Sequence, residues 1–422
     1  MPSWTSRVRR LPEPAHGGGN AQSPAVPTAA LDASPAHAAA YAVGLYLIAW
    51  ATAALLLRRA AIARAVESAV GRHASIDGLR GVLATAVFVC HSVAAHGWFV
   101  RGRWQWSGNA VLDHCGQTAV AMFFMITGFL FTQKAGAASI DWLALYRSRA
   151  ARLWPLYALV VCVVFALALA HTGFTPREPL PVLLRQFLQW LAFVCFGRPD
   201  VNGIALTWTM IAGVNWSLKY EVIFYVFGVP ALHLCARLMS ARTALAVALA
   251  LLAAVLAWRV HVQDTADYKL WTAHFLGGVA VAYAMAWPAA RALLAGRPLH
   301  WIAALAFALL PLWPHAWDWP AVLITLLAFA AVAGGASACG LLHSRPARWL
   351  GEASYGVYLL HGLLLWTVFG ALHACGRLPG LGTPAFLLLA VGLSATLVVL
   401  ASVSHLVVER PAILWARRRA AR

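Results

Sequence analysis

The chain has 422 residues, of which 62% are hydrophobic and only 11% are charged, and its mean hydropathy is +0.72. A soluble globular domain does not need so much apolar surface, and the long apolar runs show no strand-like alternation, so the sequence predicts an all-α, polytopic membrane helical bundle. The net charge of +18 comes from arginines clustered between the apolar runs. This pattern is typical of membrane orientation signals and argues against a nucleic-acid partner.

The segments follow one another in a simple order. Residues 1–37 are polar and rich in proline and glycine, which predicts a disordered N-terminal segment without a cleavable signal peptide. Residues 38–74 hold an extra transmembrane helix and a basic linker, residues 75–411 form the main membrane domain, and residues 412–422 form a basic cytoplasmic tail. Helices of the main domain are expected near 79–96, 118–133, 154–171, 216–236, 243–260, 270–288, 299–316, 320–340, 352–372 and 385–408.

The arginine clusters decide how many of these segments span the membrane. A further apolar run at 182–197 is short and carries Arg185, Gln186 and Gln189. If this run does not span, every arginine cluster lies on the cytoplasmic side. We therefore expect ten core transmembrane helices and one extra N-terminal helix. On this map Cys115 and Cys375 both lie outside, either as free thiols or as a disulfide.

The stretch from Ser75 to Ser92 contains the first candidate for chemistry. It reads SIDGLRGVLATAVFVCHS, and Arg80 and His91 are about 16 Å apart along an ideal helix. Arg80 is thus expected at one membrane surface and His91 near mid-depth. An ionisable residue at that depth is costly and is a functional candidate, although a core histidine bonded to a neighbouring helix is the alternative.

Six segments in order resemble the membrane-bound acyltransferase-3 family, with Thr127 where the family usually has serine. They are SIDGLRG followed by His91, FFMITGFL (123–130), YRSRAARLWPLY (146–157), NWSLKYEVIFY (215–225), LGEASYGVYLLH (350–361) and VERP (408–411). The resemblance implies a multi-pass protein of the bacterial inner membrane that transfers an acyl group. The donor would be acetyl-CoA or another acyl-CoA, and the acceptor would be a hydroxyl of a surface glycan or glycolipid.

The resemblance also gives roles to particular side chains. His91 would be the general base, or would itself receive the acyl group. Arg149 and Arg152 share a helix face and would grip the CoA phosphates, with help from Arg80, whereas without the resemblance anchoring at the membrane surface is the favoured explanation of such arginines. Arg80 and Asp77 are also spaced for a salt bridge on one helix face.

Glu221 is the second catalytic candidate, because a carboxylate can orient an imidazole. It lies on the expected outer half of its helix, and it could instead bind sugar hydroxyls. Val222 stands where the family often has a second acid, which weakens any role that needs two carboxylates. Trp216 and Tyr225 could offer apolar faces to a sugar or simply belong to the interfacial aromatic belt.

The remaining candidates are weaker. Tyr355, Tyr358 and His361 recur at helical spacing, which favours core packing, and no metal-ligand spacing occurs in the sequence. The alternative to an acyltransferase is a transporter or flippase with His91 and Glu221 in a proton or substrate pathway. The absence of visible internal repeats in the sequence counts against this alternative.

Overall fold

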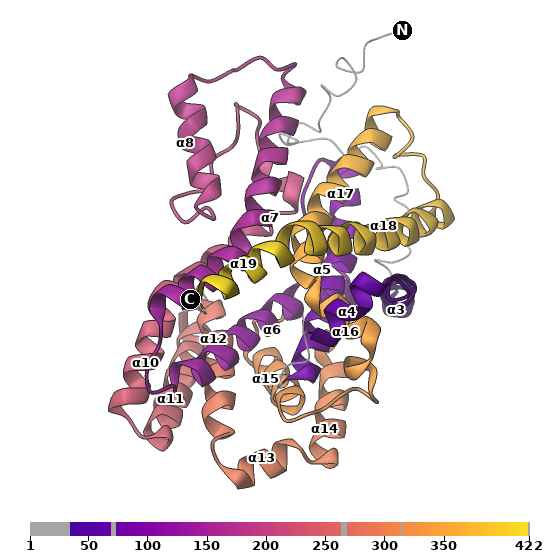
Figure 1. Ribbon diagram of the computed structural model, residues 1–422. Coiled ribbons are helices and arrows are strands. Elements are labelled where there is room, and N and C mark those ends of the chain that lie inside the picture. The colour runs from indigo at the N-terminus through magenta and orange to yellow at the C-terminus, as the bar shows by residue number, and fades with distance from the viewer. Residues whose placement is uncertain (1–33, 69–72, 263–267, 314, 421–422) are drawn as a thin grey trace.

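The computed structural model describes residues 34–68, 73–262, 268–313 and 315–420 (Figure 1). In this part of the chain every regular element is a helix, and strand geometry is limited to one isolated bridge between Val201 and Ile204. The predicted all-α helical bundle is therefore confirmed. Apolar runs of this length dictate such a result in lipid, because a helix satisfies every backbone N–H and C=O within its own segment.

Eight of the described helices are long and apolar enough to cross a membrane, which makes the chain a multi-pass membrane protein. A ninth crossing results if α12 and α13, which are bent by 118° relative to each other, count as one. The eight are α3 (Pro35–Leu56), α5 (Ala74–Arg101), α6 (Ala110–Ala135), α7 (Trp142–His171), the unit of α9 and α10 (Asn215–Leu238), α11 (Ala241–Val262), α17 (Ser354–Ala374) and the unit of α18 and α19 (Thr383–Arg419).

Two predicted crossings, 299–316 and 320–340, are shorter than expected. They correspond to apolar helices at Arg297–Leu312 and Trp319–Ala333, and prolines lie at or near their ends, where a missing N–H group disfavours continuation. The other elements are α4 (Ala60–Ser68), α8 (Leu180–Leu191), α12 (Tyr268–Ala284), α13 (Pro288–Leu294), α14 (Arg297–Ala308), α15 (Trp319–Ala333), α16 (Arg345–Glu352), and the short turns η1 (Thr207–Ile211), η2 (Phe224–Gly228), η3 (Leu310–Leu312), η4 (Leu341–His343) and η5 (His405–Glu409).

The short run at 182–197 and the N-terminal segment correspond to α8 and to the region around the start of α3. Helix α8 has 12 residues, whereas a helix needs about 20 residues to span a bilayer. It lies beside α7 (Figure 1). Its length agrees with the prediction that this segment does not cross the membrane. Helix α3 begins at Pro35, with Ser34 as its N-cap. The predicted disordered segment therefore includes a few helical residues at its end, and residues 1–33 lie outside the described residues.

Several basic segments meet at one end of the bundle, where α5, α7 and α17 begin; we call it the arginine end. Arg348 donates to the Val66 carbonyl at 3.0 Å, which joins α16 to the linker after α3. Arg147 donates to the Arg419 carbonyl at 3.4 Å, which joins α7 to the C-terminal tail. These contacts are those expected if the arginine clusters share one side of the membrane.

Helix α5 is the centre of the bundle. It is buried along most of its 28 residues and packs against α6, α16 and α17. The crossing with α16 is so close that a Cβ added to Gly351 would lie 1.9 Å from the Asp77 carbonyl oxygen. Small residues allow such approaches between membrane helices, where packing rather than the hydrophobic effect holds helices together.

We therefore expect Gly351→Ala to destabilise the protein, since overpacking costs about 1–3 kcal/mol. The midpoint of thermal unfolding in detergent, followed by the loss of the monodisperse peak in size-exclusion chromatography, should fall by several degrees. Gly392→Ala on α18 is the matched control, because no atom lies within 4 Å of its added Cβ. Equal midpoints for the two variants would contradict the close crossing of α5 and α16.

Candidate active site

His91 is distinguished from its neighbours on α5 by exposure. It is the only residue between Leu83 and Phe99 that is not buried. Its Nδ1 lies 2.7 Å from Nε2 of His361 on α17, and the two rings are nearly parallel, with centroids 5.0 Å apart. The mid-helix histidine therefore forms a hydrogen-bonded pair with a second histidine.

The hydrogen bonds of this pair determine which nitrogen atoms carry protons. Nδ1 of His361 lies 3.2 Å from the Val357 carbonyl oxygen, which can only accept. With both imidazoles neutral, Nδ1 of His361 is therefore protonated, and its Nε2 accepts from Nδ1–H of His91. This arrangement leaves a lone pair on Nε2 of His91, the atom that a general base needs.

The sequence favoured core packing for the late-helix residues, and all three, Tyr355, Tyr358 and His361, are buried. The Tyr355 hydroxyl donates to the Leu153 carbonyl at 2.7 Å, and the Tyr358 hydroxyl bonds with Ser217 at 2.7 Å. Both contacts tie α17 to its neighbours. The contact of His361 with His91 could not be predicted, because a periodic pattern places a residue on a helix face without identifying what lies opposite.

Arg80 lies at the arginine end, as predicted. Its Nη2 donates to the Ser354 hydroxyl at the start of α17, at 3.0 Å, rather than to the neighbouring carboxylate of Asp77. It also interacts electrostatically with Arg152, Glu352, Asp77 and Glu221. The salt bridge predicted between Asp77 and Arg80 is thus replaced by a wider cluster of charges.

Arg149 and Arg152 extend this cluster from α7. The guanidinium carbon of Arg149 lies 5.5 Å from the Phe131 ring centroid, and its buried Nε has no hydrogen-bond partner among the described residues. Arg152 interacts electrostatically with both Arg80 and Tyr225. The fold thus gathers the three predicted donor-binding arginines, all of them half-buried, at one end of the bundle.

Glu221 does not contact His91, so the expected pairing of these two residues is not found. Its carboxylate accepts a hydrogen bond from the Tyr225 hydroxyl, and it interacts electrostatically with Arg80 and Tyr355 near the arginine end. Glu221 is followed by a π-helical turn, η2, and such turns are frequent at functional sites. The carboxylate therefore belongs to the arginine cluster rather than to the histidine pair.

The two aromatic residues predicted to bind a sugar lie in different surroundings. Tyr225 is buried, and its ring packs against Phe131 at 4.9 Å. Trp216 is half-buried and stacks near Trp271 at 4.6 Å, beside Phe124. Substrate binding by either residue stays a prediction, and only Trp216 retains an exposed part of its ring system.

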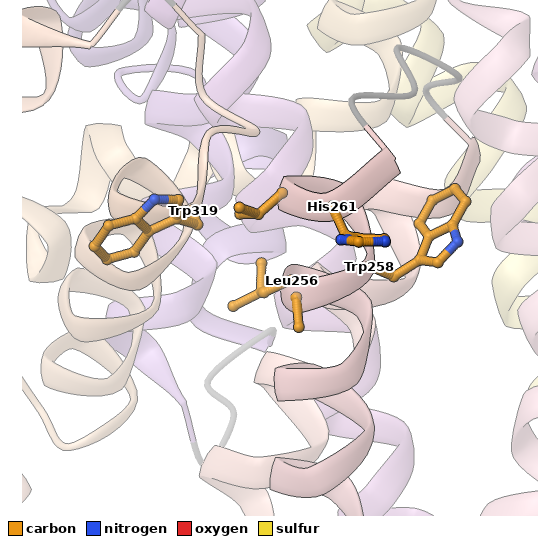
Figure 2. Close-up of a pocket in the computed structure, with 6 residues that line it drawn as sticks. Leu256, Trp258, His261 and Trp319 are labelled. Carbon is orange, nitrogen blue, oxygen red and sulfur yellow. The ribbon is translucent and has the colours of Figure 1, made fainter.

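The other candidate centres in the described residues offer little chemistry. They hold no group of three His, Cys, Asp or Glu side chains that could bind a metal ion. Cys115 and Cys375 are free thiols. An open groove of about 900 Å³ lies between α11 and α15, with Leu256 and His261 on one side and Trp319 on the other (Figure 2), but none of the predicted site residues lines it.

The sequence of the chain matches those of known proteins. The acyltransferase domain family, acyltransferase-3, matches residues 73–403. The chain is also 30% identical over 311 residues to the exopolysaccharide production protein ExoZ of Rhizobium meliloti (strain 1021), which covers 72% of this chain and 92% of that protein. No solved structure matches the chain. The match over most of the chain, together with a histidine pair inside a helical membrane bundle, shows that this protein is an acyltransferase and belongs to the acyltransferase-3 family.

Proposed function

We propose that the chain is an integral O-acyltransferase of the bacterial inner (plasma) membrane. It would move an acyl group, in the first instance acetyl, from acyl-CoA to a hydroxyl of a surface carbohydrate or its lipid-linked precursor. The observation that carries this proposal is the half-exposed His91, whose Nε2 has a free lone pair inside an otherwise buried stretch of α5. The similarity to ExoZ, an exopolysaccharide production protein, supports a polysaccharide acceptor.

The donor site would be formed by the arginine cluster. Guanidinium groups bind phosphate with two parallel hydrogen bonds, and Arg149 has a buried Nε without a partner among the described residues. With the CoA phosphates held by Arg80, Arg149 and Arg152, the pantetheine arm would extend along α5 toward His91. The distance from Arg80 to His91 along the helix is about 16 Å.

The transfer would follow general-base chemistry. Nε2 of His91 takes the proton of the acceptor hydroxyl while that oxygen attacks the thioester carbonyl. The tetrahedral intermediate then collapses, the C–S bond breaks, and the imidazolium returns the proton to the CoA thiolate. His361 holds Nδ1–H of His91 throughout and thereby keeps Nε2 directed at the acceptor. In the alternative route Nε2 attacks the thioester itself, and the acyl group rests on His91 before the acceptor removes it.

The transporter hypothesis predicts a different use of the same residues. A flippase has no need of CoA, whereas the proposed enzyme must bind and consume it. The membership of the acyltransferase-3 family favours the enzyme. Because Glu221 bonds with Tyr225 and not with His91, the two residues also do not form the contact that a relay between them would require.

Replacement of the base is the first test. We expect His91→Gln in lipid nanodiscs to lower acceptor-dependent CoA release by about 10²–10⁴-fold, with an unchanged Kd for acetyl-CoA. Radiolabelled acetyl-CoA and a crude envelope glycan fraction provide the assay. His261→Gln, an exposed histidine on α11, is the control and should keep full activity. Normal turnover by His91→Gln would eliminate the general-base role, and label retained on denatured wild-type protein would identify the acyl-enzyme route.

If Nε2 of His361 accepts from Nδ1–H of His91, a hydrogen-bond acceptor at position 361 is needed for full activity. A glutamine at this position can present an amide oxygen near the place of Nε2, whereas leucine has no acceptor. We expect His361→Gln to retain at least about ten times the kcat of His361→Leu, because general-base catalysis as a whole is worth about 10²–10⁴-fold. The KM for acetyl-CoA should not change in either variant. Equal kcat values would show that His361 only fills space.

Donor binding by the arginine cluster is tested with Arg152→Ala. A hydrogen bond to a charged group contributes about 1.5–3 kcal/mol, so the Kd for acetyl-CoA should rise at least about tenfold. Isothermal titration in nanodiscs measures this change. Arg345→Ala is the matched control, because Arg345 forms an exposed ion pair with Glu67 at 2.9 Å in the region joined to the arginine end. If both variants bind acetyl-CoA as the wild type does, the cluster is not the phosphate site.

A further inference from the structure

Beyond His91, on the side away from Arg80, a row of side chains leads out of the site. The loop after α5 brings the Trp104 ring to 5.8 Å from the His91 ring centroid. Trp208 of η1 meets Trp104 edge-on, also at 5.8 Å. The guanidinium carbon of Arg198 lies 4.8 Å from the Trp208 ring centroid. We call Trp104, Trp208 and Arg198 the outer shelf.

The half of the shelf that carries Trp104 is fixed to α6. The Asp113 carboxylate, in the first turn of α6, accepts hydrogen bonds from the backbone N–H of Ser107 at 2.9 Å and of Gly108 at 3.1 Å. Asn109 caps the same helix by accepting from the Val111 N–H. The loop that holds Trp104 against His91 is therefore anchored at its end next to α6.

The half that carries Trp208 is fixed to the helix of His361. A Cβ added to Gly362, the residue after His361, would lie 2.2 Å from the carbonyl carbon of Ile211. The backbone of η1 thus packs directly on α17 at the level of the histidine pair. This contact sets the position of Trp208 relative to the base.

The segment between α8 and α9 is held in a costly conformation. Between α8 and α9 five residues other than glycine have a positive φ, a region that L-residues rarely adopt; they are Phe193, Val194, Asn202, Leu206 and Ala212. Such strain persists only where surrounding contacts over-determine it. Asn202 provides such contacts, since its buried side chain donates to Thr172 at 2.8 Å and accepts from the Arg177 N–H at 2.7 Å.

Arg198 is the charged end of the shelf. Its side chain is exposed, and the guanidinium lies against Trp208 without a hydrogen bond or ion pair to another described residue. It interacts electrostatically with Asp200, but that carboxylate accepts from the Thr207 N–H at 3.2 Å. The N–H groups of Arg198 are therefore available for an external carboxylate, which a guanidinium binds through two parallel hydrogen bonds.

We infer that the outer shelf is the acceptor subsite of this enzyme and that it takes an acidic glycan. A sugar ring lies against the half-exposed indoles of Trp104 and Trp208, whose apolar rings suit the C–H face of a hexose. The carboxylate of a uronic acid or of an acidic substituent binds Arg198, and a hydroxyl of the same glycan reaches Nε2 of His91. This inference rests on the proposed function, because it treats His91 as the base.

The test uses two acidic tetrasaccharides, an α-linked galacturonate and a β-linked glucuronate, each paired with its carboxyl-reduced neutral form. Binding to the full chain is measured by isothermal titration in nanodiscs of zwitterionic lipid, so that no anionic headgroup competes. We expect at least one acidic tetrasaccharide to bind about tenfold tighter than its neutral partner, which corresponds to about 1.4 kcal/mol. Arg198→Gln should abolish this preference, and Trp208→Ala should weaken both members of the pair.

Arg177→Gln is the matched control, because Arg177 is an exposed arginine in the neighbouring loop and should leave the preference intact. Equal affinities for the acidic and neutral forms in the wild type would overturn the inference. A preference that survives in Arg198→Gln would also overturn it and would leave Arg198 with only its contact to Trp208. If the preference depends on Arg198 but CoA is never released, the subsite stands and the proposed function fails.

Discussion

The contact between His91 and His361 is the constraint on which the rest of the site depends. Two imidazoles between membrane helices, that of His361 buried and that of His91 half-exposed, each need a hydrogen-bond partner, because an unpaired polar group is expensive in that environment. Each ring supplies the partner of the other, and the Val357 carbonyl fixes the direction of the bond. The close packing of α5 against α17 and α16 is therefore a chemical requirement as well as a source of stability, since a shift of either helix by part of a turn would separate the two rings.

Helix α5 arranges the site as a sequence of environments along one axis. At its beginning, Arg80 belongs to a cluster of charges that can attract an anion. In its middle, the histidine pair lies among buried apolar residues. Beyond the end of α5, the Trp104 ring packs near the His91 ring. A thioester donor with a charged head and a long neutral arm is compatible with this order, because each part of such a molecule would meet surroundings of matching polarity.

Much of the fold could be predicted from the sequence, because long apolar runs permit little except helices in lipid. The failures occur where local breaks or tertiary contacts decide. The bend of 118° between α12 and α13 lies at Pro288, where the sequence predicted only the end of one helix near 270–288. Glu221 was expected beside His91, yet its partner is Tyr225, one helical turn away on the same element. His361 is buried, as core packing predicts, but its contact with His91 was not expected, because helical spacing identifies a face but not the residue opposite.

The loop between α8 and α9 shows most clearly what a sequence pattern cannot reveal. Val194 and Leu206 have a positive φ, which no local preference of these residues would suggest. The conformation exists because Asn202, Thr207 and Gly362 fix the loop from several sides. The two ends of the site are thus built by different physical means, with charge at the arginine end and backbone constraint at the outer shelf. Since Trp104 contacts the His91 ring and the backbone of η1 packs on Gly362 beside His361, changes in the rest of this loop would alter the proposed acceptor preference without moving the proposed base.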